Sequence, residues 1–285
     1  MNSFDEYAQS FADLLNAGSS IPLAEAPELV RPNIADDAPK VLIFSPHPDD
    51  EVIMGGLPLR LMRQSGWRVI NVAVTQGSNP QRQAPRWDEL AACCRCIGFE
   101  LVATSENGLT NIQPSAAEAN GPDWKKAVDV IAGLLSEHQP RLIFFPHRHD
   151  WNSTHIGVHF LLLHALRQLG DEIAPFICET EFWGQMRSPN LAVQSSAQEV
   201  GGLISALAYH VGEVQRNPYH LSLPAWMIDN TRRGNELVGG QGKSGPDMQF
   251  ATLYRRGRWD GSHIVSAKEG AFLCLNDDPA SLFTP

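Results

Sequence analysis

The chain has 285 residues and a formal net charge of −10 at pH 7, and 43% of its residues are hydrophobic. This length and hydrophobic content suffice for one large core. The acidic balance argues against nucleic acid or an anionic membrane surface as a partner. No apolar run approaches the roughly twenty residues that a membrane span needs, and residues 1–16 lack the basic start of a secretion signal. We therefore expect a cytoplasmic protein without a membrane span, and the sequence leaves a homo-oligomer open.

Residues 1–39 are expected to form an N-terminal extension that packs on the core, with a helix from about Ser3 to Leu15. From residue 40 onward, short apolar runs alternate with helical patterns, and the expected strands are Val41–Ser45, Arg68–Thr75, Glu100–Ser105 and Leu142–Phe145. Such alternation is typical of a parallel sheet flanked by helices. The predicted fold class is α/β: a Rossmann-like, mostly parallel sheet in a single domain over residues 40–285, with a C-terminal accessory region.

A run of ligand-type side chains directly follows the first expected strand: His47-Pro48-Asp49-Asp50-Glu51. Ligands in open α/β sheets gather beyond the carboxyl ends of the strands. An imidazole and a carboxylate suit zinc or a similar divalent ion, and one of two adjacent aspartates can bind the metal while the other faces its water. Alternatively, the acids mark an ordinary turn and helix N-terminus.

The expected strand Leu142–Phe145 leads into a second such run, from His147 to His155. A helix is expected from about Ser153, which places His155 in its first turn, where it can face a metal. His159 lies one turn further on the same side. It is either a second ligand beside His155 or a histidine packed on an apolar helix.

With these motifs in this order, the chain resembles the LmbE-like, or PIG-L, family of zinc-dependent N-acetylglucosamine deacetylases. His47–Glu51 stands where the family carries its signature pentapeptide, and the run ending in His155 matches its second histidine motif. Thr75–Gly77 matches the family's Thr-x-Gly, and Arg86–Leu90 matches an Arg-x-x-Glu helix. The resemblance extends from about residue 40 to about residue 210.

The resemblance implies a set of site residues. His47, Asp50 and His155 would bind Zn²⁺, although another divalent transition metal such as Fe²⁺ would suit the same ligands. Asp49 would be the general base that takes a proton from the metal-bound water. Two histidines and one carboxylate leave an open position on the metal, which is the mark of a catalytic site rather than a structural one.

The chain departs from the family pattern at two positions. Asn152 stands where the family has a histidine, three residues before the one that matches His155, and His210 lacks the Ser-Gln pair that commonly follows it. Asn152 can still donate a neutral hydrogen bond to a developing oxyanion. We expect Asn152 and His210 to take part in catalysis, with His147 or His149 as alternative sources of a charged or proton-donating group.

Substrate recognition is assigned to residues in the loops. Arg82 and Arg86 follow the second strand and can reach sugar hydroxyls or a phosphate, and His149 is assigned to substrate binding as well. Alternatively, Arg86 pairs with Glu89 on a helix surface. The turn-rich stretch Asn217–Trp226 suits a lid or a sugar platform, or an ordered loop in which Trp226 is packed.

The sequence thus predicts a metal-dependent hydrolase that removes an acetyl group from an N-acetylated amino sugar or its conjugate, a small-molecule substrate. One alternative is a hydrolase of another acylamide with the same metal ligands. Another is a noncatalytic metal- or sugar-binding relative. A third use of two histidines and a carboxylate, in non-haem iron oxygenases, is disfavoured by the alternating strands and helices. The clustered Cys93, Cys94 and Cys96 are expected in the core rather than at a metal.

Overall fold

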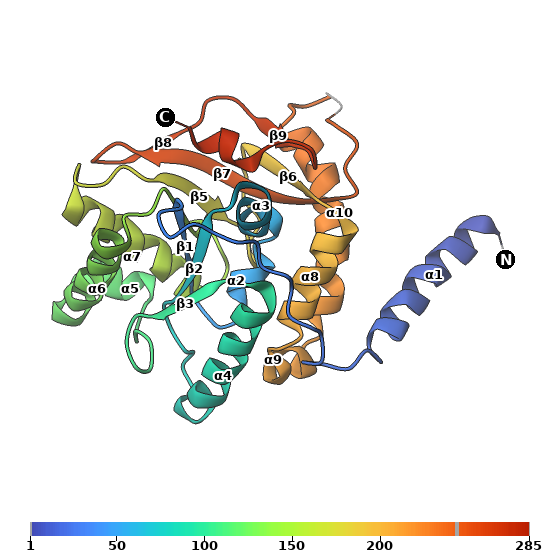
Figure 1. The fold of residues 1–285 in the computed structure, drawn as a ribbon, viewed down its shortest axis with the longest axis horizontal. Helices are drawn as coiled ribbons and strands as arrows, with labels where there is room; N and C mark the ends of the chain where they lie inside the picture. Colours follow the sequence, from blue (N-terminus) through green and yellow to red (C-terminus); the bar gives the residue numbers. More distant parts are fainter. Residues whose placement is uncertain (1, 243–244, 285) are drawn as a thin grey trace.

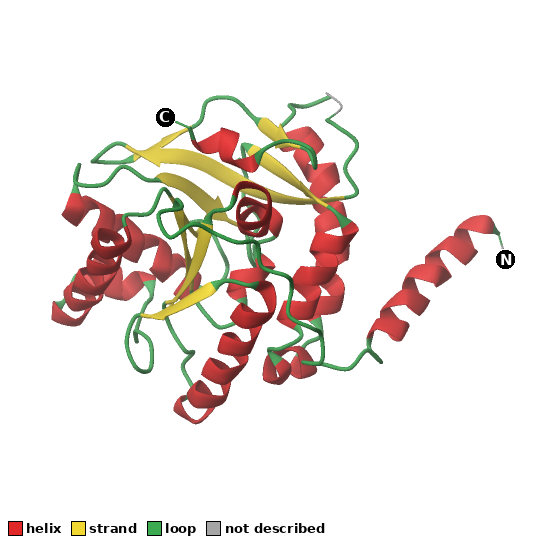
Figure 2. Cartoon of the chain, in the orientation of Figure 1, coloured by secondary structure: helices red, strands yellow, loops and turns green. Residues whose placement is uncertain are grey.

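The fold is described from a computed structural model of the chain, which covers residues 2–242 and 245–284. Its strands are β1 Lys40–Ser45, β2 Arg68–Ala73, β3 Glu100–Ala103, β4 Leu142–Pro146, β5 Phe176–Thr180, β6 Leu191–Ser195, β7 Phe250–Trp259, β8 Ile264–Ser266 and β9 Ala271–Leu273. They form one sheet in the order β3-β2-β1-β4-β5-β7-β6-β9, with β8 paired to β7 (Figures 1 and 2). Strands β1 to β5 run parallel, and β7 is antiparallel to both of its neighbours in this order. The predicted α/β class is confirmed.

Helices cover both faces of the sheet (Figure 1). They are α1 Ser3–Gly18, α2 Asp50–Ile53, α3 Gly56–Ser65, α4 Pro80–Ile97, α5 Pro114–Ala119, α6 Pro122–His138, α7 Ser153–Leu169, α8 Ala197–Leu207, α9 Val211–Arg216, α10 Tyr219–Leu237 and a short 3-10 helix, Pro279–Phe283. One apolar cluster joins the sheet to α3, α4, α8 and α10, and a second joins it to α6 and α7. None of the helices in the described ranges is both long and apolar enough to span a bilayer.

Strand β1 explains why its sequence is apolar without a break. Val41 and Ile43 belong to the first cluster, whereas Leu42 belongs to the second and Phe44 to both. In a strand that is buried on both faces, every side chain points into a core, so apolar and polar residues do not alternate along it. β1 is therefore held firmly by two layers of helices, and the loop that follows it starts from a fixed point.

The carboxyl ends of β1 and β4 form the crevice of the sheet. The two strands pair in parallel, and the chain leaves β1 toward β2 on one side and β4 toward β5 on the other. Helix α3, after β1, packs on the first cluster, and α7, after β4, packs on the second. Such a reversal of strand order opens a crevice outside the strand ends, where ligands bind. Both motifs singled out in the sequence enter this crevice.

Residues 1–39 contact the body to different extents. Residues 23–34 do contact the first cluster, through Leu23, Leu29 and Ile34. In contrast, α1 has no buried residue, contacts α10 at its C-terminal end and otherwise extends away from the body (Figure 1). An amphipathic pattern indicates that a helix carries an apolar stripe, but the stripe need not face the core of its own chain.

The C-terminal third completes the sheet instead of forming a separate accessory region. Strand β7 lies between β5 and β6, and the fully buried Arg60 of α3 donates hydrogen bonds to main-chain carbonyls of Gln194 and of residues 273, 274, 275 and 277. The stretch Asn217–Trp226 is largely helical, because α10 begins at Tyr219. Its Trp226 is partly buried against the first cluster, so the packed alternative is confirmed for this side chain.

Candidate metal centre and active-site cavity

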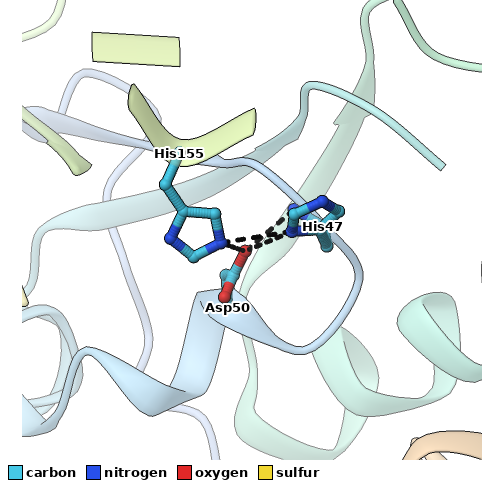
Figure 3. A group of neighbouring side chains, drawn as sticks. All are labelled: His47, Asp50 and His155. Atoms are coloured by element: carbon cyan, nitrogen blue, oxygen red, sulfur yellow. Dashed lines mark hydrogen bonds and ion pairs between the residues drawn. The ribbon is translucent and has the colours of Figure 1, made fainter. Parts of the chain in front are cut away.

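Three ligand atoms meet beyond the ends of β1 and β4 (Figure 3). The Nδ1 atom of His47 lies 3.2 Å from Nε2 of His155, and Oδ2 of Asp50 lies 3.4 Å from the first nitrogen and 3.2 Å from the second. Asp50 and His155 are buried, and the side chain of His47 is 19% exposed. The structure thus brings together the three residues that the family resemblance assigned to the metal.

The spacing of these atoms fits a metal ion. A point at equal distance from the three lies about 1.9 Å from each, close to the about 2.0–2.2 Å of zinc–nitrogen and zinc–oxygen bonds. The second carboxylate oxygen of Asp50, Oδ1, is buried and accepts no hydrogen bond from the described residues. Two nitrogens and one carboxylate suit Zn²⁺ and other first-row divalent ions, so the donor set agrees with the predicted cofactor.

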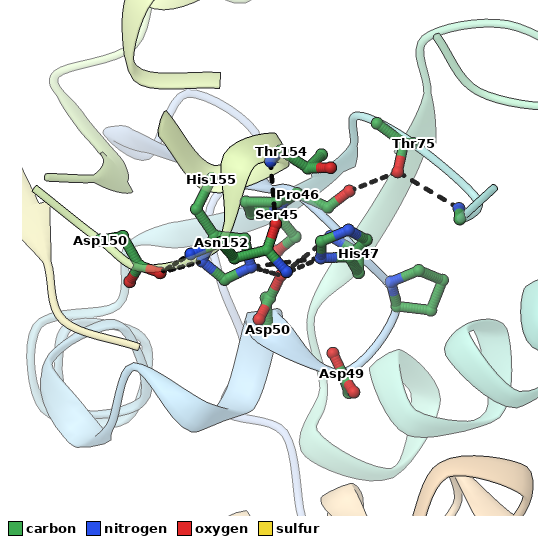
Figure 4. Close-up of polar contacts among 12 residues, drawn as sticks. Ser45, Pro46, His47, Asp49, Asp50, Thr75, Asp150, Asn152, Thr154 and His155 are labelled. Carbon is green, nitrogen blue, oxygen red and sulfur yellow. Dashed lines mark hydrogen bonds and ion pairs between the residues drawn. The ribbon is translucent and has the colours of Figure 1, made fainter. Parts of the chain in front are cut away.

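The loop that carries His47 and Asp50 is fastened at both ends (Figure 4). The Thr75 hydroxyl, at the end of the run that contains β2, donates to the carbonyl of Pro46 at 2.7 Å. The backbone N–H of His47 donates to Oδ2 of Asp50 at 2.9 Å. The carboxylate that would bind the metal therefore also fixes the turn between the two ligands.

His155 is oriented by a second carboxylate that follows β4. Its Nδ1 lies 3.6 Å from Oδ1 of Asp150, which leaves Nε2 for the metal. The Asp150 carboxylate is itself held by the backbone N–H groups of Asn152 and Gly184. Burial disfavours a charged His155, but the carboxylates of Asp50 and Asp150 outweigh burial and raise the pKa of His155 to about 10. Such a field favours a cation at this point.

Asp49 stands beside the metal ligands without contacting them (Figure 4). Its backbone is in a positive-φ conformation (φ 119°), and its N–H donates to Oε2 of Glu51 at 2.9 Å. The Tyr219 hydroxyl of α10 donates to Oδ2 of Asp49 at 2.5 Å. Burial, with a further contribution from the charge of Asp50, raises the pKa of Asp49 to about 8. A carboxylate with a raised pKa is a better proton acceptor than an ordinary one.

His210 reaches the site only through Glu51. It is fully buried, and its Nε2 lies 2.7 Å from Oε1 of Glu51, whose other oxygen holds the backbone of Asp49. Cys93 completes a second group of ligand-type atoms with these two residues. Burial and the neighbouring Glu51 raise the pKa of the Cys93 thiol, which keeps it protonated and disfavours metal binding. Cys93, Cys94 and Cys96 are all buried, as expected of core residues.

A cavity of about 700 Å³ opens onto the ligands, and its lining includes His47, Asp49, Asn152 and Trp183. Arg82 and Arg86 line it as well. The buried Glu213 gathers three arginines at this wall, with Arg82 and Arg216 as direct hydrogen-bond partners and Nε of Arg86 at 3.6 Å. Arg86 also donates to the carbonyl of Pro48, so its charge faces Glu213 and the loop of the first motif, and the surface pairing with Glu89 is wrong.

The histidines near the second motif have different surroundings. His149 is exposed and lines a separate cavity of about 370 Å³, together with His147, so the structure does not bring it into the cavity of the metal ligands. His159 is buried, lies 3.0 Å from the carbonyl of Pro146 through Nδ1, and does not belong to the ligand group. Of the two alternatives for His159, the packed histidine is confirmed.

Asn152 lines the main cavity and also begins α7. Its Oδ1 accepts the backbone N–H of Thr154 at 2.8 Å, as an N-cap does. The Nδ2 group has no hydrogen-bond partner within residues 2–242 and 245–284. The amide is therefore oriented by the helix, and its N–H groups are available to the cavity.

Sequence reasoning missed Tyr219 and Glu213. Both lie in the C-terminal third, where no motif marks them, and they join the site only because α9 and α10 fold back over the first loop. Asp150 and Glu51 could have been identified from the sequence, because each lies in one of the two motifs. Their roles toward His155 and Asp49 depend on distances that spacing does not give.

Part of the chain matches a known protein family. Residues 42–166 match the model of the PIG-L family, described as GlcNAc-PI de-N-acetylase, and the resemblance expected from the motifs is confirmed over this range. No curated protein matches the chain.

Solved structures share the fold at low sequence identity. The N,N'-diacetylchitobiose deacetylase of Pyrococcus horikoshii matches with 18% identity and a TM-score of 0.55, over 90% of this chain and 93% of its own. The zinc-inhibited form of the teicoplanin deacetylase Orf2 matches with 13% identity and a TM-score of 0.54, over 80% and 99%. The 4-carboxy-2-hydroxymuconate hydratase GalB of Pseudomonas putida KT2440 matches with 15% identity and a TM-score of 0.54, over 76% and 95%. The shared fold therefore does not fix the reaction, which has to be argued from the site.

Proposed function

Because residues 42–166 match the PIG-L family model, we propose that the chain is a metal-dependent hydrolase that removes an acetyl group from an N-acetylated amino sugar or its conjugate. One observation carries the proposal. Three ligand atoms lie within 3.4 Å of one another, next to the buried carboxylate of Asp49, which contacts none of them, and a cavity of about 700 Å³ opens onto this group. Metal ligands and an unengaged carboxylate next to a cavity are the minimum that metal-assisted hydrolysis needs.

The metal, for which we propose Zn²⁺ held by His47, Asp50 and His155, would supply a Lewis acid that polarises the acyl carbonyl and makes water a better nucleophile. In the proposed reaction, Asp49 accepts a proton from the attacking water. The Nδ2 group of Asn152 donates a hydrogen bond to the acyl oxygen as that oxygen gains negative charge. The amide C–N bond then breaks, the proton that Asp49 accepted is available to the leaving amine, and acetate and a free amine result.

The remaining residues around Asp49 are proposed to position it. Tyr219 holds the carboxylate by one oxygen, and Glu51 holds the backbone N–H of the same residue. His210 is buried behind Glu51, so we assign it to orienting Glu51 and not to contact with the substrate. Asp49 lines the cavity, whereas Tyr219 and Glu51 are not among its lining residues.

Arg82 and Arg86 are proposed to bind the polar or anionic part of the substrate. With Arg216 they present three guanidinium groups to one buried carboxylate, Glu213, so this wall of the cavity is positively charged in an otherwise acidic chain. Guanidinium groups bind phosphate and carboxylate groups well and also donate to sugar hydroxyls. His149 lies in the separate cavity, so it is not included in this assignment.

A second candidate is a protein that binds the acylated sugar without turning it over. The observation that favours it is Asn152: a neutral amide at the position of a histidine stabilises a developing oxyanion less than a charged donor does. Hydrolysis of another acylamide by the same groups is the alternative within the enzyme class.

The test is amine release from a panel of N-acetylated amino sugars, anionic and neutral, by protein stripped with a chelator and reloaded with zinc, iron or cobalt. Release that returns with metal supports the proposal and begins to identify the substrate. Release from other acylamides alone supports the alternative enzyme. Metal binding and sugar binding without release from any compound support the binding protein.

A further inference from the structure

Helix α1 carries the largest exposed apolar side chains that share one element of the structure. The exposed fractions are 84% for Phe4, 64% for Tyr7, 44% for Phe11, 69% for Leu14 and 47% for Leu15. None of the residues of α1 is buried. A contiguous apolar surface of this kind marks an interaction site, whereas single exposed hydrophobic residues need no explanation.

The spacing of these side chains identifies the kind of surface that would cover them. Phe4, Tyr7, Phe11 and Leu14 follow one another at alternating steps of three and four residues, and the next position of the series, Gly18, lies against Leu221 of α10. Over these two heptads the spacing is that of a and d positions, which form an apolar seam that faces another helix. The partner that the pattern fits is therefore a helix with a matching seam.

The charges of α1 favour a second copy of the same helix. The acidic residues Asp5, Glu6 and Asp13 all fall at heptad positions b and c, on the side away from the seam. The flanking e and g positions hold only uncharged residues, namely Ser3, Ala8, Ser10, Leu15 and Ala17. Two copies can thus meet seam to seam without placing like charges opposite each other. An anionic membrane is disfavoured as the partner, because α1 has no lysine or arginine.

We propose that α1 pairs with α1 of a second copy of this chain and makes the protein a dimer. Apart from its C-terminal end, which contacts α10, the helix extends away from the body, so Phe4, Tyr7, Phe11 and Leu14 are open to a partner (Figure 1). The six aromatic rings of such a pair would bury on the order of 1,000 Å², near the lower end of specific interfaces. Pairing would also stabilise α1, because a helix of 16 residues is marginal alone in water.

The experiment is sedimentation equilibrium of the full chain over a wide range of protein concentration. We expect twice the mass of one chain for the native protein and a dissociation constant raised about a hundredfold or more by Phe11→Glu. The control is Gln9→Glu, which adds the same charge at position f, opposite the seam, and should keep the dimer. Phe11 and Gln9 are both exposed, so neither change disturbs the folded body. A native chain that stays monomeric, or a Phe11→Glu dimer as tight as the native one, overturns the proposal.

A dimer could form by pairing of the two α1 helices or by docking of α1 on the body of the partner. A cysteine in the middle of the seam distinguishes these two arrangements. Position 11 is an a position, so it meets position 11 of the other copy in a parallel pair and position 7 in an antiparallel one. Under mild oxidation, Phe11→Cys alone or Tyr7→Cys combined with Phe11→Cys should give a covalent dimer, and Gln9→Cys should not; a dimer that neither of the first two variants cross-links contradicts seam-to-seam pairing. If the native chain forms no dimer in solution but sediments together with phosphatidylcholine vesicles, the apolar stripe of α1 binds a lipid surface instead.

Discussion

The hydroxyl of Tyr219 donates a 2.5 Å hydrogen bond to Oδ2 of Asp49, which joins the first turn of α10 to the loop that follows β1. The two residues are 170 positions apart in the sequence. The bond leaves one carboxylate oxygen of Asp49 for the cavity and fixes its direction. A group introduced by the C-terminal third of the chain thus sets the orientation of the proposed general base.

Replacing Tyr219 by Phe should lower kcat about tenfold to a hundredfold, the usual effect of losing a hydrogen bond to a charged group. The bond from Tyr219 lowers the pKa of Asp49, so its loss raises that pKa. The acid limb of the kcat/KM profile should therefore move to higher pH. An unchanged pH profile together with a lower Tm would assign Tyr219 to stability alone.

Replacing Asp49 by Asn should abolish proton acceptance while leaving the three ligands in place. We expect metal content close to that of the native protein and a loss of amine release of about a hundredfold to ten-thousandfold. His155→Ala is the matched variant and should lose the metal. The metal content of both variants can be measured by inductively coupled plasma mass spectrometry. If metal falls with Asp49→Asn and persists with His155→Ala, the two roles have been exchanged.

Replacing Arg86 by Gln should raise KM for an anionic N-acetylated substrate about tenfold to a hundredfold and change kcat less, because the lost interaction is a charge-assisted hydrogen bond made on binding. Arg95→Gln, at an exposed arginine of the same helix, is the control and should leave KM unchanged. Equal KM values for native protein and Arg86→Gln would restrict Arg86 to holding Glu213 and the carbonyl of Pro48.

The stability of the fold should depend on pH through His159. Burial lowers the pKa of His159 from 6.5 to about 4, so between these values the unfolded chain binds the proton and the folded chain does not. The stabilisation is complete above about pH 6.5 and decreases as the pH falls toward 4, by about 3 kcal/mol in all. The raised pKa of Asp49 gives a slope of opposite sign in the same pH range, so the contribution of His159 is the difference between two proteins. As the pH falls from 6.5 to 4, urea denaturation should show the free energy of unfolding of the native protein decreasing relative to that of His159→Gln. His263→Gln, at an exposed histidine, should keep the native slope.

Strands β1, β2 and β4 could be predicted from the sequence because each is a short apolar run buried on both sides, and the partly buried edge strand β3 could be predicted from its place in the alternation. Strand β5 could not, since its sequence mixes polar residues into the run, and the sequence of β7 does not indicate its partners. β5 ends in Glu179 and Thr180, and β7 contains Arg255, Arg256 and Arg258. An antiparallel strand that enters between β5 and β6 from far along the chain leaves no local signal of its partners.

The site was predictable to the extent that it lies in the two motifs. His47, Asp50 and His155 each follow a strand whose position in the sheet the apolar runs indicate, so their meeting could be expected from topology. His149 has a suitable side chain in the same run, but the backbone after β4 directs it into the separate cavity. Spacing could not identify Tyr219, since a residue that touches Asp49 from α10 depends on the packing of α10 against the body.

The positive φ of Asp49 has a consequence for how this protein can evolve. Glycine adopts a φ of 119° freely, whereas a residue with a side chain pays about 1–3 kcal/mol to hold it. Selection for stability alone would therefore favour glycine at this position, and the protein would tolerate heat better while losing its proposed base. A lineage that no longer needs the reaction should drift at position 49 before it drifts at the buried metal ligands, which also hold the turn together.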